Sequence, residues 1–384
     1  MRKIPLVDLK AQYEEVKKEI WEGWGKAFET MHLMLGPNIE AFEKEFAAYC
    51  GSKFGVGVDS GTNAVYFALK ALGINEDHEV ITVSHTFFAT VEAILYTGAY
   101  PRFVDIKEDS YTIDPDAVEE FINTKCEYNN GKLIDKETGR EIKAILPVHL
   151  YGNPADMDEI LKIAQKYNLF VVEDAAQAHG AEFKGRKVGS FGDTASFSFY
   201  MSKNLSALGE AGIVLTGKKE YAEILKSYRV HGQTDKYTHK FVGYNARLDE
   251  VQAIVLRAKL KKLDEWNEKR IKLANYYNEK LKDIPVVLPK IEKDKKHVFH
   301  LYVIRTKSRD QLFNYLRENG VGAGIHYPIP CHLQPAIEEL GYEEGDLPVT
   351  EKVAKEVLSL PMYPHLKEED VDYIVDKIKD FFSK

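Results

Sequence analysis

Residues 170–216 constrain the fold of this chain more than any other stretch. Their sequence, FVVEDAAQAHGAEFKGRKVGSFGDTASFSFYMSKNLSALGEAGIVLT, predicts a strand, a loop, a second strand, a turn and a third strand. The first strand, residues 170–172, ends on two acids, of which the second is Asp174. The second strand, residues 194–200, alternates small and aromatic residues and is followed by Lys203. An acid and a lysine at the ends of neighbouring buried strands predict one shared site.

The setting of Lys203 predicts a buried side chain. A lysine in a turn is most often a solvated charge, but this one follows the almost uncharged run SFSFY and precedes NLSALG. Burial disfavours the ammonium form and lowers the pKa of the amine, which makes it a nucleophile able to form an imine. Asp174 can be an ordinary strand-end carboxylate, or it can keep a pyridine nitrogen protonated. Together the two residues predict pyridoxal 5′-phosphate (PLP) as the cofactor.

A phosphate site is one of two readings of residues 55–73. A short strand runs into the turn DSGTN and then into the helix AVYFALKALG, which Gly73 closes. The free N–H groups and the positive helix end around Gly61 and Thr62 can bind phosphate without a lysine. An ordinary N-cap by Ser60 or Thr62 explains the same residues equally well. The glycines here have the spacing GxGxxxG, one residue too long for a dinucleotide-binding turn.

Alternating strands and helices predict a mostly parallel sheet covered by helices. A strand over residues 79–83 is followed by a helix over 90–97 and a strand over 102–105. Phe87 follows the first of these strands, at the end where open α/β sheets bind ligands. Core packing is the commoner fate of one aromatic residue, but this setting favours stacking on a flat cofactor ring. The polar residues 126–142 predict a surface hairpin, to which we assign no chemistry.

The C-terminal part predicts a second, smaller unit. Residues 249–281 form a long amphipathic pattern, and the elements that follow are a strand, a helix and a strand, over residues 300–306, 309–319 and 322–326. A chain of 384 residues exceeds the usual size of a single core. We therefore expect a large PLP-binding α/β domain over residues 1–255, and a linking helix with a small α+β domain over residues 256–384. The N-terminal helix, residues 6–30, can pack on the small domain.

Composition excludes several classes of protein. The hydrophobic content of 44% supports a globular core, and a net charge of −8 without a basic stripe argues against nucleic acid as a partner. Three separated cysteines suit a reducing compartment. Acidic residues near the N-terminus argue against a signal peptide, and no stretch approaches the roughly 18 apolar residues of a membrane span. These features predict a soluble cytoplasmic protein.

Metal and serine-hydrolase chemistry have little support. The only close pair among twelve histidines is His297 and His300, without an HExxH or CxxC motif. The GxSxG motif of a serine hydrolase is absent. No metal site is predicted.

Four ordered segments carry a family resemblance: VVEDAAQAHG, ASFSFYMSKNLSALGEAGIVLT, VGYNARLDEVQA and GIHYPIPCHLQPA. Together they resemble the DegT/StrS (DegT/DnrJ/EryC/StrS-type) family of PLP-dependent sugar aminotransferases along essentially the whole chain. The resemblance implies the aspartate-aminotransferase-like type I fold, with a large, mostly parallel sheet of the seven-stranded type. It also implies an obligate homodimer whose two active sites are shared between subunits.

The resemblance assigns roles residue by residue. Lys203 would hold PLP as a Schiff base and later move a proton at the substrate carbon. Asp174 would bind the ring nitrogen, Gln177 the ring hydroxyl, and Phe87 would stack on the ring. The phosphate would be held by Gly61, Thr62 and Ser198, and by Asn245 of the partner subunit. The candidates for the sugar pocket are His326, Tyr327, Arg229 and His231.

The implied reaction is amino transfer from an amino acid, expected to be glutamate, to a nucleotide-linked keto-deoxysugar. The segments KNL, GIHYP and HLQPA are most similar to those of enzymes acting on dTDP-linked 3-keto-6-deoxyhexoses. The alternatives are a 4-keto-sugar or cyclitol aminotransferase and a non-catalytic PLP-fold regulator. Met201 replaces the family's usual proline, and Gly209–Gly212 reads GEAG where GDGG is common. Relatives with histidine in place of the lysine dehydrate sugars, so Lys203 argues against that branch.

Overall fold

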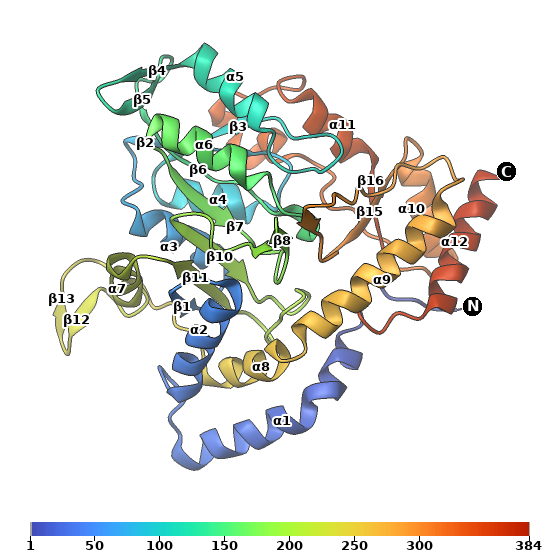
Figure 1. Cartoon of the computed structure of the whole chain (residues 1–384), viewed down its shortest axis with the longest axis horizontal. Helices are drawn as coiled ribbons and strands as arrows, with labels where there is room; N and C mark the ends of the chain where they lie inside the picture. Colours follow the sequence, from blue (N-terminus) through green and yellow to red (C-terminus); the bar gives the residue numbers. More distant parts are fainter. Residues whose placement is uncertain (1, 384) are drawn as a thin grey trace.

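A large sheet with helices on both sides forms the body of the molecule in the computed structural model, which describes residues 2–383 (Figure 1). Seven strands form its main path in the order β1-β11-β10-β7-β6-β2-β3. The four pairings from β10 to β3 are parallel, whereas β11 is antiparallel to both of its neighbours. The predicted α/β fold with a mostly parallel sheet is confirmed.

The strands of this sheet are short and almost wholly buried. Their bounds are β1 (Phe54–Val58), β2 (His78–Val83), β3 (Tyr100–Val104), β6 (Glu141–Ile145), β7 (Phe170–Asp174), β10 (Thr194–Ser198) and β11 (Gly212–Thr216). The predicted hairpin consists of β4 (Cys126–Asn129) and β5 (Lys132–Asp135), and β5 also pairs with β6. The polar residues 126–142 therefore extend the sheet.

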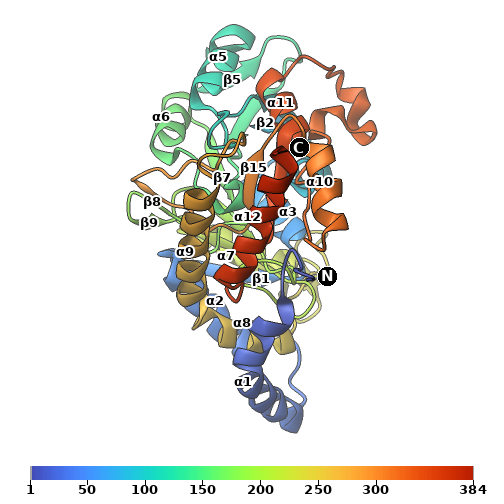
Figure 2. The same ribbon diagram turned by 90° about the vertical axis from the view of Figure 1, so that its right-hand side faces the viewer.

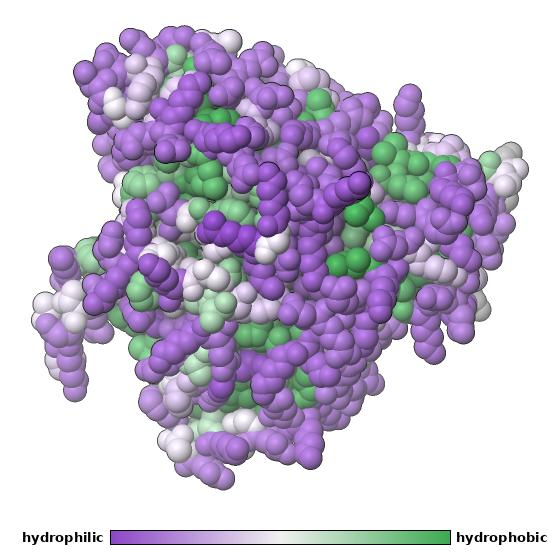
Figure 3. All heavy atoms as spheres, in the orientation of Figure 1, coloured by the Kyte–Doolittle hydropathy of each residue, from purple (hydrophilic) through white to green (hydrophobic). Residues whose placement is uncertain are grey.

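Twelve α-helices lie within the described residues. Their bounds are α1 (Leu9–Thr30), α2 (Pro37–Cys50), α3 (Gly61–Ala71), α4 (Ala89–Tyr96), α5 (Pro115–Lys125), α6 (Met157–Tyr167), α7 (Lys219–Tyr228), α8 (Glu250–Leu260), α9 (Leu263–Leu281), α10 (Arg309–Glu318), α11 (Pro348–Glu356) and α12 (Glu368–Phe382). Short 3₁₀ turns are η1 (Leu150–Gly152), η2 (Cys331–Leu333) and η3 (Pro335–Leu340). Among residues 2–383 no helix is both long and apolar enough to cross a membrane. Figure 3 shows a face covered mainly by hydrophilic residues.

The alternation of side chains along β10 explains how the sheet is covered. Phe197 lies in the cluster that α2 forms with Phe42 and Phe46. The neighbouring side chains point to the opposite face, where Thr194 donates a hydrogen bond to the carbonyl oxygen of Ala68 in α3. Large residues thus fill one face of β10. The small residues on the other face let α3 come close.

A second core lies in the C-terminal part. It is built from α9, α10 and α12 around the antiparallel pair β15 (Tyr302–Arg305) and β16 (Val357–Leu360). Both termini lie on this side of the molecule, where Arg2 forms a 2.6 Å ion pair with Asp370 (Figure 2). Three small pairings complete the structure: β8 (Glu182–Phe183) with β9 (Arg186–Lys187), β8 with β14 (Lys295–Lys296), and β12 (Gln233–Asp235) with β13 (Thr238–His239).

Two predicted elements differ from the structure. The single helix predicted over residues 249–281 is two helices, α8 and α9, that separate at Lys261 and Lys262. The break lets α8 pack on α1 and α2 while α9 runs on to α12. The strand predicted over residues 322–326 is wrong, because this segment divides its backbone hydrogen bonds between Ile4 and Ser359 and then turns away.

Candidate active site

A cavity of about 540 Å³ opens at the carboxyl ends of the central strands. It brings together nine of the twelve predicted site residues, although they come from segments up to 266 positions apart: Gly61, Thr62, Phe87, Asp174, Gln177, Ser198, Lys203, His326 and Tyr327. Open α/β sheets bind ligands at this edge. The cavity is therefore the candidate active site.

Lys203 lies in the turn after β10, where its backbone N–H donates to the carbonyl oxygen of Tyr200 over 2.9 Å. Burial lowers the pKa of its amine to about 8, although the nearby carboxylates of Asp174 and Glu210 act in the opposite direction. The predicted fall in pKa is confirmed. At this pKa about one amine in ten is unprotonated at pH 7, a few hundred times the fraction of an ordinary lysine, and the unprotonated form is the nucleophile.

Asp174 is the last residue of β7, and its carboxylate is bound on both oxygens. Thr90 donates to Oδ2 over 2.8 Å, and the backbone N–H of Ala176 donates to Oδ1 over 3.1 Å. Burial raises the pKa of Asp174, whereas these two donors and Lys203 act to lower it. The donors hold the carboxylate in one orientation at the cavity wall, where a protonated ring nitrogen would stabilise its charge.

The preceding residue, Glu173, faces the opposite side of the sheet. Its carboxylate accepts hydrogen bonds from the ring of His149 and from the backbone N–H groups of Gly189, Phe191 and Gly192. Successive strand residues point to opposite faces. This alternation explains why only the second of the two acids reaches the cavity.

The start of α3 forms one wall of the cavity against the end of β10. Ser60 caps the helix by accepting a 3.2 Å hydrogen bond from the N–H of Asn63. The first N–H groups of a helix have no acceptor within it. Gly61 and Thr62 line the cavity, so their N–H groups are free to bind an anion there. The N-cap by Ser60 is confirmed, and because it does not use the N–H groups of Gly61 and Thr62, it leaves the predicted phosphate site open.

An aromatic pair closes another side of the cavity. The rings of Phe87 and Tyr327 lie 5.7 Å apart between centroids, and the hydroxyl of Tyr327 accepts a 3.1 Å hydrogen bond from Gln177 Nε2. Phe87 is 56% exposed, so it is not a core residue. It has a free face to present to a flat ring.

Several cavity residues were not predicted. Thr90, Glu210 and His300 line it, and the N-terminal segment adds Leu6 and Val7. Thr90 carries a weak signal, since it follows directly on the strand-end segment SHTFFA. The others reach the site only through long-range packing, which leaves no pattern in the sequence.

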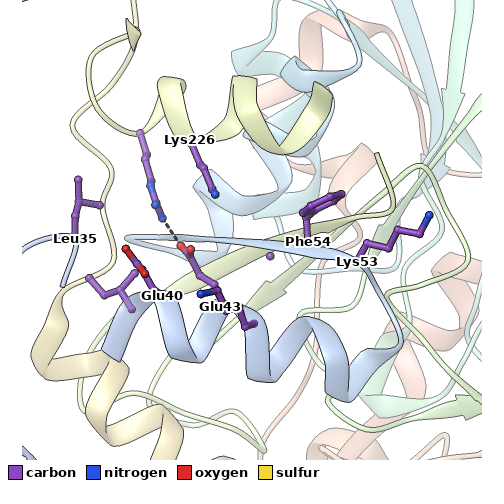
Figure 4. Close-up of a pocket in the computed structure, with 10 residues that line it drawn as sticks. Leu35, Glu40, Glu43, Lys53, Phe54 and Lys226 are labelled. Carbon is purple, nitrogen blue, oxygen red and sulfur yellow. Dashed lines mark hydrogen bonds and ion pairs between the residues drawn. The ribbon is translucent and has the colours of Figure 1, made fainter. Parts of the chain in front are cut away.

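Three predicted residues lie outside the cavity. Arg229 is buried and forms an ion pair with Glu43, beside a separate cavity of about 620 Å³ (Figure 4). His231 and Asn245 are exposed, and Asn245 forms a backbone bridge with Val230. The structure of one chain thus does not bring these three residues to Lys203.

The cavity residues fit PLP. An amine with a lowered pKa, a fixed carboxylate, an aromatic face and a helix start line one space. The close contact between Gly61 and Ser198, where a Cβ atom on residue 61 would lie 2.5 Å from Ser198 Cβ, leaves the wall with backbone N–H groups and a hydroxyl, as a phosphate needs. Among residues 2–383 no group of His, Cys, Asp and Glu side chains is arranged to hold a metal. Fold and site define a PLP-dependent transferase.

Comparison with known proteins gives the same class. The model of the DegT/DnrJ/EryC1/StrS aminotransferase family matches residues 14–379. The chain belongs to this family, whose members are PLP-dependent. It is an aminotransferase.

Individual relatives are similar over their whole length. The chain is 42% identical to the dTDP-3-amino-3,4,6-trideoxy-alpha-D-glucose transaminase of Streptomyces venezuelae over 383 residues, covering 100% of this chain and 97% of that one. It is 44% identical to the pleiotropic regulatory protein of Geobacillus stearothermophilus over 382 residues, covering 99% and 98%. The crystal structure of S. venezuelae DesV in complex with a ketimine intermediate superposes with a TM-score of 0.93 at 42% identity, covering all of both chains.

Proposed function

We propose that this aminotransferase moves an amino group from an amino acid to a dTDP-linked 3-keto-6-deoxyhexose, forming the 3-amino sugar. The observation that carries the reaction type is the placement of Lys203 and Asp174 in one cavity beside the start of α3. The similarity to a dTDP-3-amino-sugar transaminase over the whole chain supports the sugar. Glutamate is the donor that we expect.

PLP, when bound, would supply the electron sink that stabilises charge at the carbon bearing the amino group. In that site Lys203 would attach the cofactor through Nζ and, once released, would remove and return the proton at that carbon. Asp174 would hold the ring nitrogen protonated, and the hydrogen bond from Thr90 keeps its carboxylate oriented for that contact. The N–H groups of Gly61 and Thr62 and the hydroxyl of Ser198 would bind the phosphate.

The sugar would enter past His326 and Tyr327. Burial and the charge of Lys203 lower the pKa of His326 to about 4, so its ring is neutral at pH 7. Its Nδ1 is hydrogen bonded to Ser359 over 2.8 Å. A neutral ring with one nitrogen in use can exchange a hydrogen bond with a sugar hydroxyl through the other.

A homodimer with shared sites would explain why Asn245 and His231 lie outside the cavity of their own chain. Asn245 is exposed and can reach the cavity of a second copy, and His231 lies on the neighbouring strand segment. We place the large PLP-binding domain at residues 1–255 and the small domain at residues 256–384. We place the enzyme in the cytoplasm, because its three cysteines are free and a reducing compartment keeps thiols in that state.

Cofactor attachment tests the reaction type. Purified protein loaded with PLP should absorb in the visible, and borohydride should fix the cofactor on the peptide that contains Lys203. Lys203→Met should abolish attachment. Lys259→Met is a matched control, because Lys259 is also a buried lysine with a pKa lowered to about 8, but it binds Ser206 and not the cavity. A colourless protein with no bound PLP would end the proposal.

The substrate requires a separate assay. The panel should contain dTDP- and UDP-linked 3-keto and 4-keto sugars and a keto-cyclitol, with each amino product identified by mass spectrometry and NMR. We expect the dTDP-linked 3-keto sugar to be converted with the highest kcat/KM. A higher kcat/KM for a 4-keto sugar or the cyclitol would replace the proposed substrate.

A regulatory role is the second candidate, because one relative at 44% identity bears the name pleiotropic regulatory protein. It predicts cofactor binding without turnover. Turnover of any sugar in the panel at rates typical of enzymes would contradict a purely regulatory role and support the aminotransferase.

A further inference from the structure

Tyr151 lies beneath the candidate active site in the turn that follows β6. Its side chain is buried, with 2% of its surface exposed. Its φ angle is +60°, in the left-handed region that residues other than glycine seldom adopt. A residue held in this conformation is fixed by its surroundings, and such positions cluster at functional sites.

Hydrogen bonds join Tyr151 to two parts of the cavity, Gln177 and His326, that are 149 positions apart in sequence. Its backbone N–H donates to Gln177 Oε1 over 2.8 Å, and its hydroxyl donates to the carbonyl oxygen of His326. Gln177 Nε2 in turn donates to the hydroxyl of Tyr327 over 3.1 Å. These contacts close a ring through Tyr151, Gln177, Tyr327 and His326.

His85 fixes the direction of the hydroxyl. Its Nε2 lies 2.8 Å from the hydroxyl oxygen of Tyr151. Since the one hydroxyl proton is donated to His326, His85 must donate through Nε2–H. Burial and the charge of Arg305 keep this ring neutral, with a pKa lowered to about 3. The tyrosine hydroxyl therefore has one arrangement.

We propose that Tyr151 is a positioning residue that sets the distance between the cofactor side of the cavity, through Gln177, and the sugar side, through His326 and Tyr327. This proposal rests on the proposed function of those three residues. The two links use different atoms of Tyr151, the backbone N–H toward Gln177 and the hydroxyl toward His326. Removing the hydroxyl thus breaks the link to the sugar side and the hydrogen bond from His85, and it leaves the link to Gln177 intact.

Tyr151→Phe tests the proposal by separating the two half-reactions. The variant keeps the backbone N–H and the ring packing against His85, whose centroid lies 5.9 Å away. The first half-reaction, in which glutamate converts bound PLP to its amine form, can be monitored by absorbance in the absence of sugar. Its rate in the variant should stay close to that of the wild type. The KM for the keto sugar should rise about tenfold, as expected for the loss of a buried hydrogen bond.

Tyr111→Phe is the matched control. Tyr111 is a buried tyrosine whose ring centroid lies 5.7 Å from that of Tyr151 and 5.8 Å from the guanidinium of Arg305, and it makes no hydrogen bond to His326. This variant should leave the KM for the sugar unchanged. Equal effects of both variants on both half-reactions would overturn the proposal, because they would show a general loss of packing.

Hydrogen exchange on the cofactor-free protein gives an independent readout. Peptides covering residues 324–328 should exchange faster in Tyr151→Phe than in the wild type and in Tyr111→Phe, while peptides around residue 177 should not change. Wild-type exchange at residues 324–328 in Tyr151→Phe would overturn the proposal. If the wild-type enzyme aminates no sugar in the panel, the proposed function fails, and the exchange experiment still decides the role of Tyr151.

Discussion

Gly61 and Ser198 approach each other so closely that a Cβ atom on residue 61 would lie 2.5 Å from Ser198 Cβ and 2.7 Å from its Oγ. The first turn of α3 therefore rests directly on the last residue of β10. Lys203 follows five residues after Ser198. The residues proposed to bind the phosphate and the turn that carries Lys203 thus meet at one strand end, and backbone packing sets their separation.

Gly61→Ala should weaken PLP binding. The added methyl group must push α3 away from β10 or displace Ser198, and overpacking of this kind costs about 1–3 kcal/mol. If that cost falls on the bound state, the Kd for PLP rises about tenfold. Titration of the cofactor-free protein with PLP, followed by absorbance, measures it. Gly217→Ala, at a position with no heavy atom within 4 Å, is the control and should bind PLP normally.

The stability of the cofactor-free protein should depend on pH through Lys203. Its pKa is about 8 in the folded chain against an ordinary value of 10.5. Between these pH values the unfolded chain holds the proton and the folded chain has lost it, so the free energy of unfolding rises with pH. Below pH 8 both states are protonated and the burial penalty is fully present. Lys203→Met lacks this increment.

Urea unfolding between pH 7 and 10.5 checks this expectation. The difference in unfolding free energy between the wild type and Lys203→Met should move in favour of the wild type across that range. Lys259→Met should show the same trend, because burial lowers the pKa of Lys259 to about 8 as well, yet it should retain the cofactor. A flat difference for Lys203→Met would mean that its amine is solvated.

Thr90→Val should raise the pKa of Asp174. Valine keeps the shape of threonine but removes the hydroxyl that donates 2.8 Å to Oδ2. Loss of a hydrogen bond to a buried carboxylate costs its charged form about 1.5–3 kcal/mol, which corresponds to an upward shift of about one to two pH units. The acidic limb of the pH profile of kcat/KM should move up accordingly. An unchanged acidic limb would show that Thr90 does not act on this carboxylate.

The parts of the site that the sequence predicts are those set by local pattern. The period of β7 and β10 places Asp174 and Lys203 at strand ends, and the turn before α3 marks Gly61. Residues such as Tyr151 and His300 could not be predicted, since their roles depend on which strands become neighbours, and Thr90 is marked only by its place after the strand-end segment SHTFFA.

The same limit applies to whole elements. The amphipathic pattern continues across Lys261 and Lys262, because both halves of 249–281 have a buried face, but these faces pack on different parts of the molecule. Likewise, residues 322–326 have the composition of a strand. Their partners, Ile4 and Ser359, lie at the two ends of the chain.

Substitution of Arg229 should lower the free energy of unfolding, whether or not this residue contacts the substrate. Its guanidinium pairs with Glu43 and donates 2.7 Å to the carbonyl oxygen of Gly57, while Glu43 accepts 2.8 Å from the N–H of Gly57. Breaking a buried pair by removing one partner costs about 3–5 kcal/mol. Arg229→Met should therefore lower the unfolding free energy by that amount.

The double variant Glu43→Gln/Arg229→Met separates the two roles of Arg229. It leaves no unpaired charge, so it should recover part of the lost stability. If the recovered protein has a normal KM for the sugar, Arg229 is structural. A raised KM in a protein of recovered stability would return Arg229 to the substrate site.

Mixed dimers test whether Asn245 acts on the partner's cofactor. Chains carrying Lys203→Met and chains carrying Asn245→Ala are each expected to have little activity alone. The proposed shared site would take its lysine from one chain and its asparagine from the partner, so one site of a mixed dimer would contain both defects and the other neither. Random reassociation makes half of the dimers mixed, so activity should recover to about a quarter of the wild type.

The control for this experiment pairs Lys203→Met with Asp174→Asn. Both residues line the cavity of one chain, so every site of a mixed dimer carries one defect and no activity should return. Recovery in the first mixture but not in the second requires a shared site. Absence of recovery in both mixtures would contradict the shared site. Asn245 would then act in the site of its own chain or would have no part in catalysis.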